Sequence, residues 1–340
     1  MKFKRIGLIG RPAVTMLVYA AGYYLLGKLG YQFWYLNLKL SAIWPPTGVS
    51  LAVLLLWGSR WWPGVLIGSL LLNLDLGILP GAAIGIAASN ACGVLTSCWL
   101  VERFARGKRA FEQSRTIFLF ALLVGIGTSA SATLGMMNAF WGGPSIWTGF
   151  SSGWITWWLA DLTSCFLLTP FIVIWVVNPC PQWRSRRYTE GLGLLLLLVL
   201  LNLAIFCGTT AIATVEQSEW LVILPLLWAA FRFGQHGAIS AMLLIFLTAT
   251  WGFHLGHGPF ISANRVGSIH LLQFYVGTMS MTSLILVAIM SELKRAQQAA
   301  QASEGRFRLM FDTMLQGVVV HDGASTELPT TATHWNHVWT

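Results

Sequence analysis

Long apolar runs, separated by short polar segments, fill the chain from about residue 12 to residue 291. A hydrocarbon core about 30 Å thick needs roughly 20 apolar residues per spanning helix, with a range of about 17–25. By that criterion the pattern predicts ten spanning helices, at residues 12–29, 44–58, 61–77, 80–102, 116–138, 153–177, 191–208, 219–233, 237–254 and 268–291. Because the second, third and eighth runs are short, eight to ten helices are compatible with it. The predicted fold class is an all-α polytopic integral membrane protein.

The composition supports the membrane interpretation. Of the 340 residues 56% are hydrophobic and only 10% are charged, whereas a soluble globular chain carries about 25% charged residues. The 18 tryptophans are typical of a protein with side chains at the membrane–water interface. The first apolar run is no secretory signal peptide, because it lacks a small-residue cleavage site and more apolar runs follow it.

The basic residues predict the orientation of the helices. If the N-terminus is cytoplasmic, the inner loops hold all of the 21 Lys and Arg residues except Lys28, Lys39 and Arg265. Such an asymmetry is what the positive-inside rule describes. We therefore expect the protein to lie in the inner (plasma) membrane, with both termini in the cytoplasm. Basic loops facing anionic membrane lipid also explain the net charge of +9, so no nucleic-acid partner is expected.

Asp161 is the one acidic residue deep within an apolar run. A carboxylate at the centre of a spanning helix costs about 2.5–3.5 kcal/mol on insertion scales, so it should face the bundle interior or water. Two interpretations remain open: a proton or ligand contact that biases helix packing, or a structural hydrogen bond to Asn90 or Asn73. Both asparagines lie in runs rich in small residues, where side-chain amides join helices that pack closely.

Trp44-Pro45-Pro46-Thr47-Gly48, the WPPTG segment, opens the second predicted helix. Proline is tolerated at a helix start but not in its interior, and the tryptophan suits the interface. The segment is interpreted as a helix start, with a binding-site wall as the alternative.

No catalytic, cofactor or metal site is predicted. The chain has no phosphate-binding loop, zinc motif or nucleophile elbow. His254, His257 and His270 are weak candidates for metal ligands, because only two of them lie close in sequence. The five cysteines show no metal or redox spacing and are interpreted as small core residues.

Past Met290 the pattern changes to a polar helix. Residues 293–303 are mostly Ala, Gln and other strong helix formers. Leu293, Ala296 and Ala300 are spaced to pack against a second copy of the chain, although the segment is too short to establish a coiled coil. A homodimer and a solvated helix end both remain open.

Several motifs in order resemble one known family, the first type of the bacterial membrane-associated sensor domain (MASE family). The resemblance covers residues 12–295. It rests on the WPPTG segment, Gly58, Trp62-Pro63-Gly64, Asn73, Asn90, Trp157, Trp158, Asp161, Pro170, Phe231-Arg232-Phe233-Gly234 and Gly258-Pro259-Phe260. From these motifs and the intramembrane polar residues, the candidate signalling or packing residues are Asp161, Asn90, Asn73, Trp44, Pro45, Pro46 and Arg232.

The resemblance implies a sensory module whose usual output is a cyclic di-GMP cyclase or phosphodiesterase, or a histidine kinase. It implies four segments: a sensor domain at 12–292, a helical linker at 293–303, the start of a PAS domain at 304–323 and a disordered or frame-shifted tail at 324–340. Residues 303–322 resemble the first helix and first strand of a PAS domain. The Thr-rich tail does not continue that pattern, so we expect a truncated product without its catalytic domain.

The prediction is therefore a non-enzymatic membrane sensor that responds to an unknown small molecule, or to another membrane protein, and relays the signal through its last helix. The alternative is a transporter or channel, because an intramembrane aspartate and helices broken by Pro and Gly suit transport as well. A weaker alternative is an accessory protein that recruits partners in the membrane.

Overall fold

The computed structural model describes residues 12–32, 43–141, 150–179, 185–208, 218–261 and 265–322, and in these ranges it contains helices and no strand. The α-helices are α1 (Pro12–Gln32), α2 (Pro45–Trp57), α3 (Trp62–Asp75), α4 (Pro80–Phe104), α5 (Ser114–Trp141), α6 (Phe150–Val177), α7 (Ser185–Phe206), α8 (Ile223–His254) and α9 (Arg265–Asp322). Three short 3-10 helices lie between them, at Ser59–Trp61, Gly107–Glu112 and Ser218–Val222. The predicted all-α class is confirmed.

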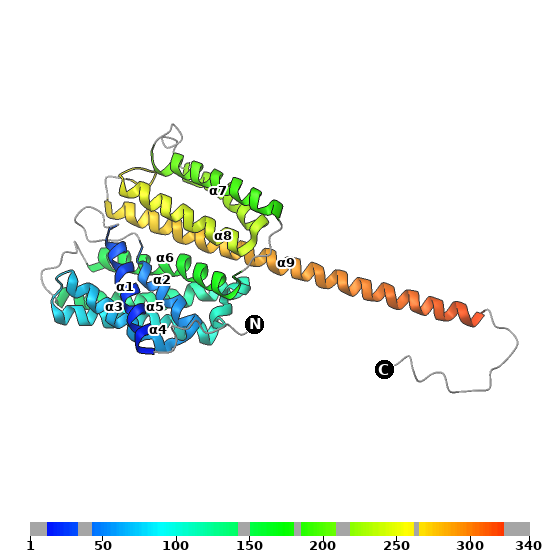
Figure 1. Cartoon of the computed structure of the whole chain (residues 1–340), viewed down its shortest axis with the longest axis horizontal. Helices are drawn as coiled ribbons and strands as arrows, with labels where there is room; N and C mark the ends of the chain where they lie inside the picture. The colour runs from blue at the N-terminus through cyan, green and yellow to red at the C-terminus, as the bar shows by residue number, and fades with distance from the viewer. Residues whose placement is uncertain are drawn as a thin grey trace. The chain divides into compact units, whose positions relative to one another are not determined.

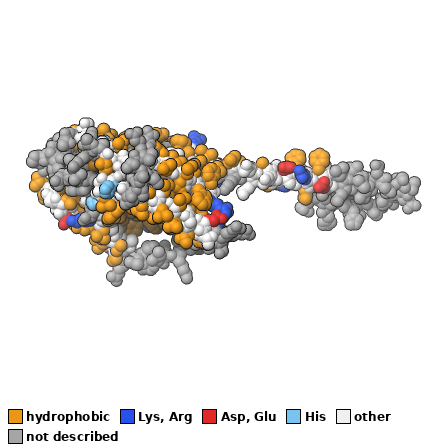
Figure 2. Space-filling model, turned by 90° about the horizontal axis from the view of Figure 1, so that it is seen from above, with side chains coloured by type: hydrophobic (Ala, Val, Ile, Leu, Met, Phe, Trp, Pro, Cys, Tyr) orange, Lys and Arg blue, Asp and Glu red, His pale blue; other side chains and the backbone are white. Residues whose placement is uncertain are grey.

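Six of these helices, α4 to α9, are long and apolar enough to cross a membrane. Hydrophobic side chains cover most of the visible surface of the helical bundle (Figure 2). On α7, Leu192, Leu196 and Leu200 follow one another at four-residue spacing and are all exposed. A row of exposed leucines suits contact with lipid. The chain is a polytopic membrane protein.

Helices α2 and α3 are too short to cross the core alone. They have 13 and 14 residues, which at 1.5 Å per residue gives about 20 Å each. Each has a proline in its first turn. Gly58 follows the last residue of α2, and glycine adopts its φ of 99° at little energetic cost. The interpretation of the WPPTG segment as a helix start is confirmed.

Helix α8 reverses direction at Gly234. This residue has φ 65° and ψ −148°, a conformation that is essentially restricted to glycine. A Cβ atom on Gly237 would lie 2.9 Å from the carbonyl oxygen of Ala229, although residues eight apart in a straight helix are about 12 Å apart along the axis. The two halves therefore form a hairpin, and they match the predicted helices at 219–233 and 237–254. With α8 counted as two, the described residues form ten α-helices.

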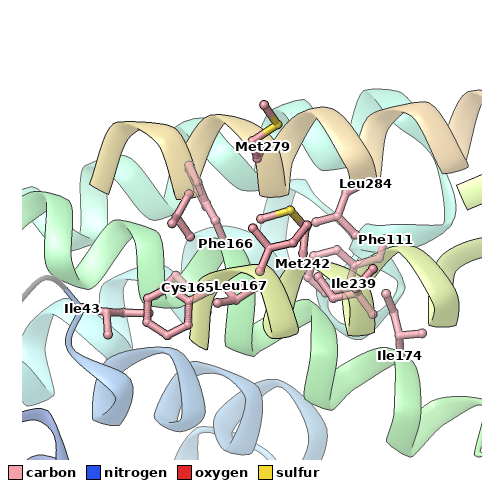
Figure 3. Close-up of a cluster of buried hydrophobic side chains, with 14 of the residues drawn as sticks. Ile43, Phe111, Cys165, Phe166, Leu167, Ile174, Ile239, Met242, Met279 and Leu284 are labelled. Atoms are coloured by element: carbon pink, nitrogen blue, oxygen red, sulfur yellow. The ribbon is translucent and has the colours of Figure 1, made fainter. Parts of the chain in front are cut away.

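Within the first compact unit, Met1–Met290, α1 to α6 lie together, and α7, α8 and the first part of α9 pack along them (Figure 1). The main hydrophobic core includes Phe166 and Leu167 of α6, Met242 of α8 and Met279 and Leu284 of α9 (Figure 3). Helix α6 therefore lies between the two groups of helices.

The cysteines only partly follow the prediction. Cys98 and Cys165 are buried core residues, but Cys92 is exposed and Cys207 is intermediate. The expectation is wrong for Cys92, because one face of α4 is open at that position. Cys180 lies outside the described residues.

Residues Ser291–Thr340 make up the second compact unit. Its described part is helical, since α9 runs from Arg265 to Asp322. The strand expected near residues 317–322 is wrong. A single strand leaves its backbone groups unpaired unless neighbouring strands are present, whereas a helix pairs them within the segment. The predicted tail at 324–340 lies outside the described residues.

We predict that Gly234→Ala lowers the thermal stability of the purified protein, because alanine adopts the backbone conformation of this turn only with strain of about 1–3 kcal/mol. Tryptophan fluorescence during heating in detergent measures the effect. The matched control is Gly193→Ala in α7, where an added Cβ would meet nothing within 4 Å. Equal melting temperatures for the two variants would contradict the hairpin.

Candidate functional site

Asp161 of α6 is completely buried, with 0% of its surface exposed. Its Oδ1 accepts a hydrogen bond of 2.6 Å from the Thr47 hydroxyl, and its Oδ2 accepts one of 3.2 Å from the Ser131 hydroxyl. Among the described residues, no ion pair reaches this carboxylate. Thr47 lies in the first turn of α2, so the positive end of that helix also stabilises negative charge here.

Polar contacts continue from Asp161 to the asparagines. The Ser131 hydroxyl lies 3.4 Å from Oδ1 of Asn90, and Nδ2 of Asn90 donates to Ser69 Oγ at 2.9 Å. Asn73 Nδ2 donates to the Ser69 carbonyl at 2.7 Å. We call Thr47, Ser69, Asn73, Asn90, Ser131 and Asp161 the polar cluster; its six side chains come from α2, α3, α4, α5 and α6.

The expected direct bond from Asp161 to Asn90 or Asn73 is not formed. Ser131 of α5 stands between α4 and α6 and bridges them, and its single proton favours the shorter contact, to Asp161. Asn73 bonds instead to Ser69 of its own helix. The sequence predicted Asp161, Asn90 and Asn73 as candidate residues, but it did not predict the hydroxyl side chains that lie between them.

The WPPTG segment holds α2 against α6 by backbone contacts. Trp44 N donates to the Ala160 carbonyl at 3.3 Å, and Gly48 N donates to Ser164 Oγ at 3.0 Å. A Cβ on Gly48 would lie 2.6 Å from the carbonyl carbon of Ser164, so only glycine permits this approach. The segment therefore both starts α2, through Pro45 and Pro46, and positions Thr47 beside Asp161.

Close packing also brings α4, α5 and α6 together. A Cβ on Gly93 of α4 would lie 2.5 Å from the Cβ of Ser131. The indole of Trp158 donates to the Gly125 carbonyl at 3.1 Å, and that of Trp154 donates to Thr133 at 2.9 Å. Small residues and interhelical side-chain bonds are the usual means of helix association in lipid, and here they fix Ser131 next to Asp161.

A second set of polar contacts joins α6 to α9. Thr156 Oγ1 lies 2.8 Å from His270 Nε2, Gln273 Nε2 donates to the Thr156 carbonyl at 3.3 Å, and Thr163 Oγ1 donates to the Gln273 carbonyl at 3.3 Å. We call these four residues the α6–α9 contact. At 100° per residue, Thr156 and Thr163 point about 140–160° away from Asp161. Helix α6 therefore bears the two sets on different faces.

Sequence reasoning missed the α6–α9 contact, apart from His270 as a weak metal candidate. The signal was Gln273, an amide within an apolar run that is only 1% exposed. His270 bonds to Thr156, and His254 lies beside Trp251 with ring centroids 6.1 Å apart. Within the described ranges, no three His, Cys, Asp or Glu side chains gather as metal ligands.

Arg232 lies outside the polar cluster. Its Nε lies 2.5 Å from Oε2 of Glu190 on α7, and its Nη2 lies 2.8 Å from Oε1 of the same carboxylate. Such a two-pronged pair fixes geometry, but both side chains are partly exposed, so solvent weakens it. Its position beside Gly234 ties the α8 hairpin to α7.

Comparison with known proteins gives a family for this arrangement. The model of the family described as MASE1 matches residues 15–294, which is most of the chain. The chain belongs to the MASE1 family. No curated protein and no solved structure matches it.

The MASE1 match covers the polar cluster, the α6–α9 contact and the Arg232–Glu190 pair. A MASE1 domain is a membrane sensor domain and not a catalytic one, so residues 15–294 form a sensory input module. The chain beyond residue 294 is not assigned by the match, and the expected PAS start finds no support in it.

We predict that Thr47→Val destabilises the protein by about 1–3 kcal/mol, because it removes a hydroxyl donor from a buried carboxylate and leaves that acceptor unpaired. Thermal unfolding in detergent measures the loss. The control is Thr278→Val in α9, since the exposed Thr278 hydroxyl bonds only to carbonyls of its own helix. If Thr47→Val were as stable as Thr278→Val, Thr47 would not support Asp161.

Proposed function

We propose that this chain is the sensory input module of a bacterial signal-transduction protein in the inner membrane, with both termini in the cytoplasm. The output that it controls is cyclic di-GMP synthesis or hydrolysis, or a histidine kinase. The family match supports the sensory part, and the distribution of basic residues supports the orientation.

One observation carries the mechanism. Helix α6 holds Asp161 on one face and binds α9 on another, through Thr156 and Thr163. A change in packing around Asp161 and Asn90 therefore moves a helix that is bonded directly to α9. Helix α9 itself extends to Asp322, past the end of the family match at residue 294, so a shift or rotation of α9 reaches residues beyond the sensor domain.

The stimulus must bind the two states of the bundle with different affinity, because a ligand shifts an equilibrium only by its differential affinity. A small molecule or a neighbouring membrane protein meets this requirement equally well. The polar cluster is the proposed receiving point, since its hydrogen bonds have a small number of discrete arrangements that a stimulus can favour. Surrounding lipid is the third partner, through the basic inner loops.

A second copy of the chain is the proposed partner of α9. Leu293, Phe307 and Met310 are exposed, and Ala296 and Ala300 complete a spacing of three and four residues from Leu293 onward. Such spacing places apolar residues along one seam of a two-helix coiled coil. A paired output domain would receive the movement of both α9 helices at once.

To test the relay, we would attach a diguanylate cyclase domain after α9 and measure cyclic di-GMP in cells. Asp161→Asn removes the charge but keeps the shape, and we predict a change of 5-fold or more in product, within the range of about 5–150-fold that allosteric coupling usually gives. In a second fusion a Gly/Ser run replaces Ala296–Ala300. In that fusion Asp161→Asn should not change the cyclic di-GMP level, because the flexible run no longer transmits a movement of α9.

The control for the relay test is Asp75→Asn, which removes a carboxylate of α3 that pairs with Lys28. It should leave the product level unchanged. Equal output from the wild type and Asp161→Asn, with both proteins present in equal amounts, would refute the relay through Asp161.

Disulfide cross-linking tests the dimer. We predict that Ala300→Cys forms an intermolecular disulfide in membranes under mild oxidation, because residue 300 lies on the proposed seam. Gln298→Cys is the matched control on the same exposed turn, about 160° away around the helix. Equal cross-linking of the two variants on a non-reducing gel would show that no fixed seam exists.

A further inference from the structure

The positive charge around Asp161 is smaller than the negative charge of its carboxylate. Its donors, the hydroxyls of Thr47 and Ser131 and the side chain of Trp157, are neutral, and no Lys, Arg or His within the described ranges pairs with the carboxylate. The start of α2 contributes the equivalent of about half an elementary charge at most. An unpaired charge within the hydrocarbon region is costly and marks ion or substrate sites in membrane proteins.

One buried hydroxyl beside the polar cluster lacks a hydrogen-bond partner. Tyr23 of α1 is 1% exposed, and its hydroxyl has no partner in the structure. The Tyr23 hydroxyl lies beside Trp44 and beside Ser69 of the cluster, without hydrogen-bond geometry to either. Buried polar groups are nearly always paired, so such exceptions point to a water molecule or an ion.

The polar cluster and Tyr23 offer several oxygen atoms. The Asp161 carboxylate, the hydroxyls of Thr47, Ser131 and Tyr23 and Oδ1 of Asn90 are ligands that hard cations accept. A single carboxylate balances a single positive charge, whereas calcium sites commonly use several carboxylates.

The packing also limits the size of a ligand. Gly48 and Gly93 lie next to the cluster, and at neither position is there room for even one added Cβ atom. At these two crossings the helices leave no space for an organic molecule.

We propose that the polar cluster binds one monovalent inorganic cation, such as Na⁺ or K⁺, between Asp161, Ser131 and Tyr23. The cation completes the charge balance of Asp161 and gives the Tyr23 hydroxyl oxygen a partner. Its binding joins α1 to α5 and α6, so occupancy changes how firmly these helices are held together. That the cation also acts as the stimulus rests on the proposed sensory function; its binding does not.

The experiment is thermal unfolding of the full chain in detergent, followed by tryptophan fluorescence. LiCl, NaCl and KCl are each titrated against choline chloride at constant ionic strength. We expect a saturable rise in melting temperature of roughly 5 °C with at least one of the three inorganic cations, and none with choline. Saturation separates binding from general salt effects.

Three variants locate the site. Asp161→Asn should abolish the cation-dependent rise, and Tyr23→Phe, which removes only one hydroxyl, should weaken the apparent affinity several-fold. Asp75→Asn should keep the full rise. No cation-dependent rise in the wild type, or a full rise in Asp161→Asn, overturns the proposal. If Asp161→Asn fails to fold, an unchanged affinity in Tyr23→Phe overturns it.

This test is independent of the output measurement. If the cation stabilises the protein through Asp161 but cyclic di-GMP from the fusion is the same in the wild type and Asp161→Asn, the site stands and the proposed relay through Asp161 fails. If output depends on Asp161 but stability does not depend on the cation, the sensory function stands and the cation site fails.

Discussion

The structure depends on one constraint: a buried carboxylate in the hydrocarbon core has no water to bond and takes its hydrogen-bond donors from other helices. Asp161 meets this constraint through Thr47 and Ser131, which lie on two neighbouring helices. Ser131 in turn contacts Asn90, and Asn90 donates a hydrogen bond to Ser69. One buried carboxylate therefore determines how five helices are placed, and glycines at their crossings let them come close enough to reach it.

The same helix that carries Asp161 also contacts α9. Thr156 and Thr163 lie two turns apart on α6, and both bond to α9 at His270 or Gln273. Because α6 lies between α1–α5 and the group formed by α7, α8 and α9, it is the natural element for passing a packing change from one group to the other. Apolar contacts of Phe166 and Leu167 with the shared core reinforce that link.

The helices were predictable because apolar runs and their Pro and Gly boundaries are local features of the chain. Even the two predicted helices at 219–233 and 237–254 were found, as the halves of α8 on either side of Gly234. Asp161, Asn90 and Asn73 were predictable as polar side chains in apolar runs.

Their exact partners were not predictable, because Thr47 and Ser131 look like ordinary small polar residues until three-dimensional packing selects them. The Thr156–His270 and Thr163–Gln273 contacts were missed for the same reason, since they join positions more than 100 residues apart in the sequence. The strand near residues 317–322 was wrong because a family-like pattern says nothing about whether the rest of a sheet is present to pair with it.

The most direct measurement of the central claim, that α6 couples the polar cluster to α9, is a double-mutant cycle on stability. Thr47→Val removes the hydroxyl bonded to Asp161 in the polar cluster, and Gln273→Leu removes the amide bonded to Thr156 in the α6–α9 contact. Coupling through α6 predicts an interaction free energy above about 0.5 kcal/mol in the double variant. Losses that add to within about 0.3 kcal/mol would show that the two sets of contacts are independent, and would contradict the relay.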